Sequence, residues 1–186
     1  MKRLSFVIAA IAATAPAAAQ GPVAVPRFDS VELQGGGHVV VRHGAVQRVT
    51  LIRGSREMTR FSVERGQLEI DACVRSCRDY DLRVEIVTPD IDALAIRGGG
   101  VIRVEGSFPR QSELAVAVTG GGAIDTRQIE TAEVAAAISG GGLIRTHARD
   151  NLAVSINGGG TVRYVGEPER SVAINGGGNV HRDSRR

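Results

Sequence analysis

The 186-residue chain has few aromatic side chains, one lysine and two cysteines, and the first two shortages each exclude a class of function. Aromatic residues make up 3% of the chain and tryptophan is missing, so the rings are too few for a platform that stacks on bases or sugars. Lys2 is the only lysine, and arginines alternate with acids along the chain, so no basic patch forms. We therefore expect no nucleic-acid partner.

Catalytic and metal-binding patterns are missing as well. Glycine triplets are present, but none has the GxGxxG or P-loop spacing that precedes a phosphate-binding helix. The acids are scattered and suggest no repeated pair, and no Ser/His/Asp triad can be assembled. The four histidines share no metal-ligand spacing: His38, His43, His147 and His181. We expect no cofactor, no metal and no enzymatic activity.

Long apolar runs are confined to the N-terminus. Residues 1–19 combine Lys2 and Arg3, an apolar stretch and a small-residue end at Ala17–Ala19, which predicts a signal peptide that is cleaved on export. No later segment is long and apolar enough to span a membrane. We expect an exported protein, periplasmic or extracellular, with residues 20–186 forming one domain.

Glycine, in contrast, is abundant, and most of it occurs in repeated triplets. Six Gly-Gly-Gly triplets hold 18 of the 24 glycines, and they begin at residues 35, 98, 120, 140, 158 and 176. From the second triplet onward the starts are 22, 20, 18 and 18 residues apart. A nearly constant period of this length indicates stacked repeats.

The residues around each triplet alternate between apolar and small or polar, which is the period of a strand with one buried face. The intervals are too short for βαβ units, and a β-sandwich gives no reason for an in-register triplet. The repeat therefore predicts an all-β parallel solenoid with glycine corners, regular over about 94–181 and degenerate up to about 93. In the degenerate part we expect strands near residues 48–53, 61–65, 67–72 and 82–88.

Cys73 and Cys77 lie in the degenerate part. In an exported chain two cysteines this close predict a structural disulfide. A redox or metal pair is the weaker interpretation, because the spacing is CxxxC and no second pair lies nearby.

A charged row is expected three residues after the triplets, where stacking would align Arg103, Asp125, Arg145 and Arg163. The ordinary interpretation is a solvated ladder whose charges pair with their neighbours, each pair contributing about 0.2 to 1 kcal/mol. The alternative is a contact with an anion or acidic glycan at Arg145 and Arg163.

A row of small residues is expected three residues before the triplets, at Ala95, Ala117, Ala137 and Ala173, with Ser155 among them. Alternation places these residues on the outside, where a flat face of alanine and serine favours contact with another surface. Another protomer, in a homo-oligomer, or segments from the degenerate part of the chain could cover it. Alanine that only relieves crowding along the row is an equally good interpretation.

Several stretches resemble the putative auto-transporter adhesin head GIN domain family: FDSVELQGGG, FSVERGQLEID, LRVEIVTPDIDALAIRGGG and the final AINGGG. The similarity covers about residues 27–181, although the family usually has Gly-Ser-Gly where this chain has Gly-Gly-Gly. It implies a single-stranded right-handed parallel β-helix, exported and without known catalytic residues. The resulting prediction is a non-enzymatic envelope or secreted protein that presents a surface to an envelope protein or glycan. The alternative is a carbohydrate-active lyase or hydrolase with an unrecognised site.

Overall fold

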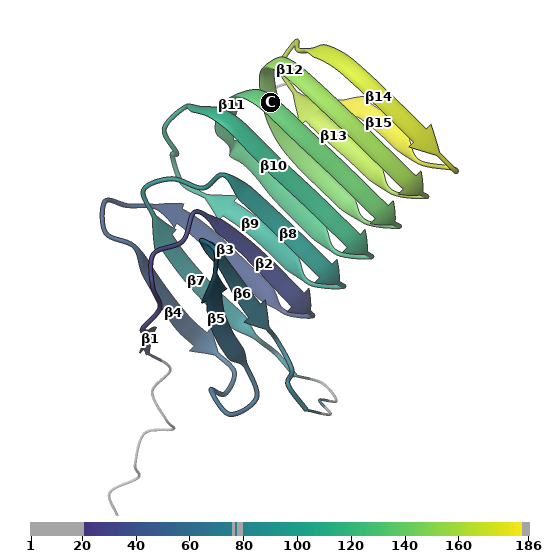
Figure 1. The fold of residues 1–186 in the computed structure, drawn as a ribbon. Helices are drawn as coiled ribbons and strands as arrows, with labels where there is room; N and C mark the ends of the chain where they lie inside the picture. The colour runs from purple at the N-terminus through teal and green to yellow at the C-terminus, as the bar shows by residue number, and fades with distance from the viewer. Residues whose placement is uncertain (1–20, 76, 78–79, 184–186) are drawn as a thin grey trace, which may run out of the picture.

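Strands make up almost all of the regular structure in the computed structural model, which describes residues 21–75, 77 and 80–183 (Figure 1). The predicted signal peptide, residues 1–19, lies outside the described residues. The strands, in chain order, are β1 (Pro22–Val23), β2 (Ser30–Gly35), β3 (His38–His43), β4 (Arg48–Arg53), β5 (Arg60–Glu64), β6 (Gln67–Asp71), β7 (Arg83–Thr88), β8 (Ala93–Gly98), β9 (Val101–Glu105), β10 (Gln111–Gly120), β11 (Ala123–Gly140), β12 (Leu143–Gly158), β13 (Thr161–Val165), β14 (Glu169–Asn175) and β15 (Asn179–Arg182).

The parallel strand pairs form two series of neighbouring strands, which we call wall 1 and wall 2. Wall 1 is the series β6-β2-β8-β10-β11-β12-β14, and wall 2 is the series β7-β3-β9-β11-β12-β13-β15. The long strands β11 and β12 belong to both, because each begins in wall 2 and ends in wall 1. In wall 1, Gly98, Gly120, Gly140 and Gly158 are register partners, so the predicted stacking of the glycine corners is confirmed.

The prediction of a single-stranded right-handed parallel β-helix is wrong. All 15 strands belong to one mixed sheet, which closes round the core almost as a barrel. Three pairs run antiparallel, β1 with β4, β4 with β7 and β5 with β6. The spatial order also departs from the chain order, since β2 lies between β8 and β6. Alternation has the same period in parallel and antiparallel strands, so the sequence pattern could not show this change of direction.

The four strands expected before residue 93 are confirmed as β4, β5, β6 and β7, but β4 and β5 are not degenerate repeats. β5 turns back along β6 in a two-residue hairpin at Arg65 and Gly66, whose φ angles are 51° and 81°. Two successive positive φ angles are typical of the type I′ turn, whose twist suits a hairpin. β4 runs antiparallel along β7. This antiparallel group forms the N-terminal end of the sheet, drawn in purple to dark teal in Figure 1.

The core is one apolar cluster enclosed by the sheet. Alternate residues of most strands enter it: Val116 and Val118 of β10 are buried, whereas Ala115 and Ala117 are exposed. Branched aliphatics dominate the cluster, and they suit a pleated surface buried on one side. Each fully buried valine, leucine or isoleucine stabilises the fold by about 1.5–3 kcal/mol relative to exposure.

The three positions of a triplet differ in what they require. At the first, Gly158 has a φ of 124°, and an added Cβ would lie 2.6 Å from the carbonyl oxygen of Gly140. At the second, Gly159 has no atom within 4 Å of an added Cβ. At the third, a Cβ on Gly160 would lie 2.5 Å from Ile138 Cγ2. The outer two glycines are therefore required by the stacking, whereas the middle position has room for serine.

Candidate functional site

Short side chains cover the outer surface of wall 1. We define the alanine face as two rows of side chains that cross the strands of wall 1 and lie two residues apart along each strand. The first row is Ala93, Ala115, Ala135, Ala153 and Ser171, and the second is Ala95, Ala117, Ala137, Ser155 and Ala173. The structure therefore brings together the small residues predicted from the sequence. All are exposed except the two on β8, which are half-buried.

The alanine face is slightly hollowed and uncovered. A shallow groove of about 310 Å³ runs across β10, β11, β12 and β14 between Ala115 and Ser171. No segment within residues 21–75, 77 and 80–183 covers these side chains. A segment of the same chain as the cover is therefore excluded for the described residues; a second protomer, or alanine that only relieves crowding along the row, stays a prediction.

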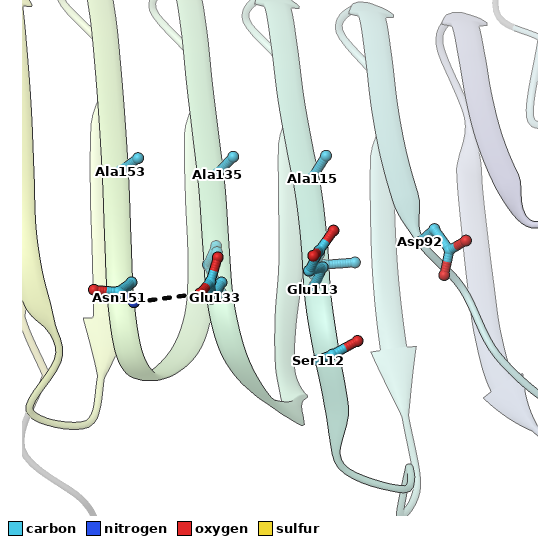
Figure 2. Close-up of a pocket in the computed structure, with 10 residues that line it drawn as sticks. Asp92, Ser112, Glu113, Ala115, Glu133, Ala135, Asn151 and Ala153 are labelled. Carbon is cyan, nitrogen blue, oxygen red and sulfur yellow. Dashed lines mark hydrogen bonds between the residues drawn. The ribbon is translucent and has the colours of Figure 1, made fainter.

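Polar rows border the alanine face on both sides. Towards the glycine corners, Thr119, Ser139, Asn157 and Asn175 are aligned and exposed. At the opposite border, Glu113, Glu133 and Asn151 are aligned (Figure 2). Glu169 is the register partner of Asn151 and continues this row. The Nδ2 of Asn151 donates a hydrogen bond of 3.4 Å to Glu133 Oε1. Donors and acceptors thus lie on either side of a surface that is itself nearly without them.

A second groove, of about 480 Å³, lies along the acidic border and includes Asp92, which precedes β8 (Figure 2). Burial raises the pKa of the Asp92 carboxyl, and the neighbouring acids, Asp29 foremost, raise it further. Sequence reasoning missed this border. The signal was available, because Glu113, Glu133, Asn151 and Glu169 each stand seven residues before a triplet.

A buried carboxylate marks the end of the alanine face at β2. Glu32 is the register partner of Ala95 but is only 4% exposed. Its carboxylate accepts a hydrogen bond of 2.7 Å from Gln67 Nε2 and forms an ion pair of 2.9 Å with Arg97 Nε. Gln34 Nε2 also donates to Glu32 and to Glu69. Because its charge is paired and hydrogen-bonded, Glu32 anchors the strands rather than offering a free acid.

The predicted charged row lies on wall 2, whereas the alanine face lies on wall 1. Arg103, Asp125, Arg145 and Arg163 are successive register partners, as expected. The carboxylate of Asp125 pairs with Arg127 of its own strand, through Oδ1 to Nε at 2.9 Å and Oδ2 to Nη2 at 2.6 Å.

Neighbouring residues of opposite charge thus partly neutralise this row. Burial by itself would raise the pKa of Asp125, but the hydrogen bonds from Arg127 and the positive charges nearby outweigh it and hold the pKa below its usual value. Nη1 of Arg163 lies 3.7 Å from Oδ1 of Asp183. These pairs agree with the solvated-ladder interpretation of the row.

The disulfide predicted between Cys73 and Cys77 is confirmed, with the two Cα atoms 6.0 Å apart. It closes a small loop after β6, in the antiparallel end of the molecule and away from the alanine face. The histidines do not gather: among the described residues, no group of three or more histidine, cysteine or acidic side chains could hold a metal ion.

Together, the fold and the face define an all-β protein whose repeated strands present a flat outer surface. The chain belongs to the putative auto-transporter adhesin family, head GIN domain, whose model matches residues 27–112 and 110–168. No protein with a curated description matches it. Within the described residues, no helix has the length and apolar character needed to cross a membrane.

Solved structures similar to the chain are distant in sequence. A putative adhesin from Bacteroides fragilis is 14% identical, with a TM-score of 0.54 over 87% of this chain and 95% of that one. A putative adhesin from Parabacteroides merdae is 13% identical, with a TM-score of 0.43 over 89% and 96%. A putative lipid binding protein from Parabacteroides distasonis is 14% identical, with a TM-score of 0.42 over 88% and 95%. At 14% identity, the likeness to the Bacteroides fragilis structure shows the fold alone.

Proposed function

We propose that the protein is a non-enzymatic, exported, adhesin-like protein whose alanine face contacts an envelope protein or glycan, in the periplasm or outside the cell. The observation that carries this proposal is the exposure of eight aligned alanine and serine side chains across β10, β11, β12 and β14. Short side chains lose little rotamer entropy on contact, and they let another surface approach the sheet closely. The rows of Thr119 and Glu113 on either side supply hydrogen-bonding groups for orientation.

Binding to intact cells or isolated envelope tests this proposal. Ala137→Arg places a long charged side chain in the middle of the face, so we expect it to weaken binding at least about tenfold. Ala45→Arg is the matched control, since Ala45 is an exposed alanine in the β3–β4 loop outside the face. Equal binding by the wild-type chain and Ala137→Arg would remove the face from the function.

A carbohydrate-active enzyme is the second candidate, and one observation favours it. Glu113 and Glu133 are register partners in a groove that also holds Asp92, and glycosidases use a pair of carboxylates in one groove. Against it, both glutamates are exposed and no aromatic ring lines this groove. Release of reducing ends from a panel of acidic and neutral glycans, abolished by Glu113→Gln, would establish the enzyme in place of the adhesin.

A further inference from the structure

The C-terminal end of the sheet is open on both walls. Among residues 21–75, 77 and 80–183, β14 pairs only with β12 and β15 only with β13, so within this part of the chain each has a free edge of backbone N–H and C=O groups. On β14, Val172 and Ile174 continue the rows that are buried in β12, yet they are 44% and 43% exposed. Their partners Val154 and Ile156 are 4% and 1% exposed. β14, the strand at the end of wall 1 (Figure 1), therefore presents core-type side chains that no further strand of the described residues covers.

The N-terminal end does not offer a matching edge. β1 is two residues long and begins with Pro22, which has no N–H to donate. β5 ends in charged residues, Arg60 and Glu64, and its apolar side chains are half-buried. Head-to-tail addition of β14 to this end would leave most of the seven-residue edge unpaired, and it would produce an open filament rather than a closed assembly.

We propose that β14 pairs antiparallel with β14 of a second copy, about a twofold axis at Val172. Centring the axis there overlaps the strand along its whole length, from Glu169 to Asn175. Glu169 then lies opposite Asn175 and Arg170 opposite Ile174, so no like charges face each other.

The pairing closes after two copies, because the same surface is used on both. It satisfies the free edge of each β14 and covers Val172 and Ile174.

Two arginines beside this edge already have partners within the molecule. The guanidinium of Arg170 lies 5.7 Å from the ring centre of Tyr164, and Arg182 forms an ion pair of 2.5 Å with Glu167. Pairing β14 with its copy therefore leaves both arginines their present neighbours, and it places Glu169 opposite the side-chain amide of Asn175. A twofold axis perpendicular to the sheet also keeps both alanine faces on the same side, so they join into one surface of doubled length.

The mass in solution tests the proposal. Sedimentation equilibrium of the purified chain from about 1 to 100 µM is expected to show a dimer that dissociates on dilution. Val172→Lys places a charge at the axis, and we expect it to raise the dimer Kd at least about tenfold. Val46→Lys is the control, because Val46 is 69% exposed and lies in the β3–β4 loop. A monomer at all concentrations, or equal effects of the two variants, overturns the proposal.

Two further measurements keep the proposal testable if Val172→Lys disturbs folding. Amide hydrogen exchange of β14 in the wild-type chain should slow as concentration rises, while that of β5 should not. Val172→Cys should form a disulfide-linked dimer, since the axis brings the two copies of this residue together. Asn175→Cys should not, since its cross-strand partner is Glu169. Crosslinking of Asn175→Cys without Val172→Cys, or exchange independent of concentration, overturns the arrangement.

Discussion

The two ends of the sheet finish the same apolar core in different ways. At the N-terminal end, antiparallel strands β4 and β5, a hairpin and a disulfide loop close round Leu51, Leu82 and Ile70, which are buried. At the C-terminal end no antiparallel strand or hairpin caps β14 and β15 within the described part of the chain, and Val172 and Ile174 are exposed. The comparison shows that repeats supply strands but not their own termination, so a cap needs sequence that departs from the repeat.

The largest expected effect comes from equivalent isoleucines at the two ends. Ile70→Ala removes a fully buried side chain and should lower the free energy of unfolding by about 2–5 kcal/mol. Ile174→Ala removes a side chain that is 43% exposed and should cost less than about 1.5 kcal/mol in the monomer. Urea unfolding of both variants at low concentration measures the difference. Equal losses would show that the C-terminal end is covered in solution.

Glycine substitutions sharpen the comparison within the repeats. Gly158→Ala forces a side chain into a positive φ and against the carbonyl of Gly140, and we expect a loss of about 2–4 kcal/mol. Gly159→Ala meets no atom and should change stability by less than about 0.5 kcal/mol, or raise it slightly. Thermal unfolding of the pair distinguishes them, and a similar loss from both would contradict the assigned roles of the two positions.

The disulfide lies in the antiparallel N-terminal end of the sheet, the capped end, so its removal tests the stability of that end alone. Cys73→Ser with Cys77→Ser opens a small loop, and loop-closure entropy predicts a loss of about 2 kcal/mol or less. The alanine face should keep its binding, because the loop does not contact it. Unfolding with and without reductant gives the first measurement, and envelope binding by the double variant gives the second; a loss of binding would contradict the separation.

The smallest expected effect concerns Asp125 in the wall 2 repeats. Its pKa is lowered in the folded protein, so its ion pair with Arg127 stabilises the fold above the pKa of the unfolded chain. That contribution is lost as the pH falls through the lower, folded pKa. Asp125→Asn should therefore cost less than about 1 kcal/mol at pH 7 and flatten the loss of stability below about pH 4. Urea unfolding at several pH values measures both, and an unchanged acid limb would argue against the pair.

The repeat region could be predicted because its signal is redundant. Each triplet has a branched aliphatic residue two positions before it, and in the middle repeats this residue points inward, as Val118, Ile138 and Ile156 show. The register follows from superimposing the triplets. The alanine face and the charged row then follow by alternation alone. The acidic border was equally periodic but lay seven residues from the triplets, beyond the flanks that were compared.

The capped end could not be predicted in the same way. Its strands were located correctly, because alternation marks a strand whatever its neighbours are. Their direction depends on turns and on tertiary pairing, and the one clear local signal was the Arg65-Gly66 turn. The insertion of β2 between β8 and β6 leaves no trace in local sequence, since it depends on contacts more than 30 residues apart.

The contact between each leading glycine and the carbonyl of the glycine beneath it has an evolutionary consequence. Gly120, Gly140, Gly158 and Gly176 all meet the same obstacle, so one unit is geometrically interchangeable with the next. Duplicating or deleting a whole unit of 18 to 22 residues would lengthen or shorten the molecule while leaving the chemistry of each outer row intact. Selection could thus change the length of this protein by whole repeat units without altering the outer surface of each unit.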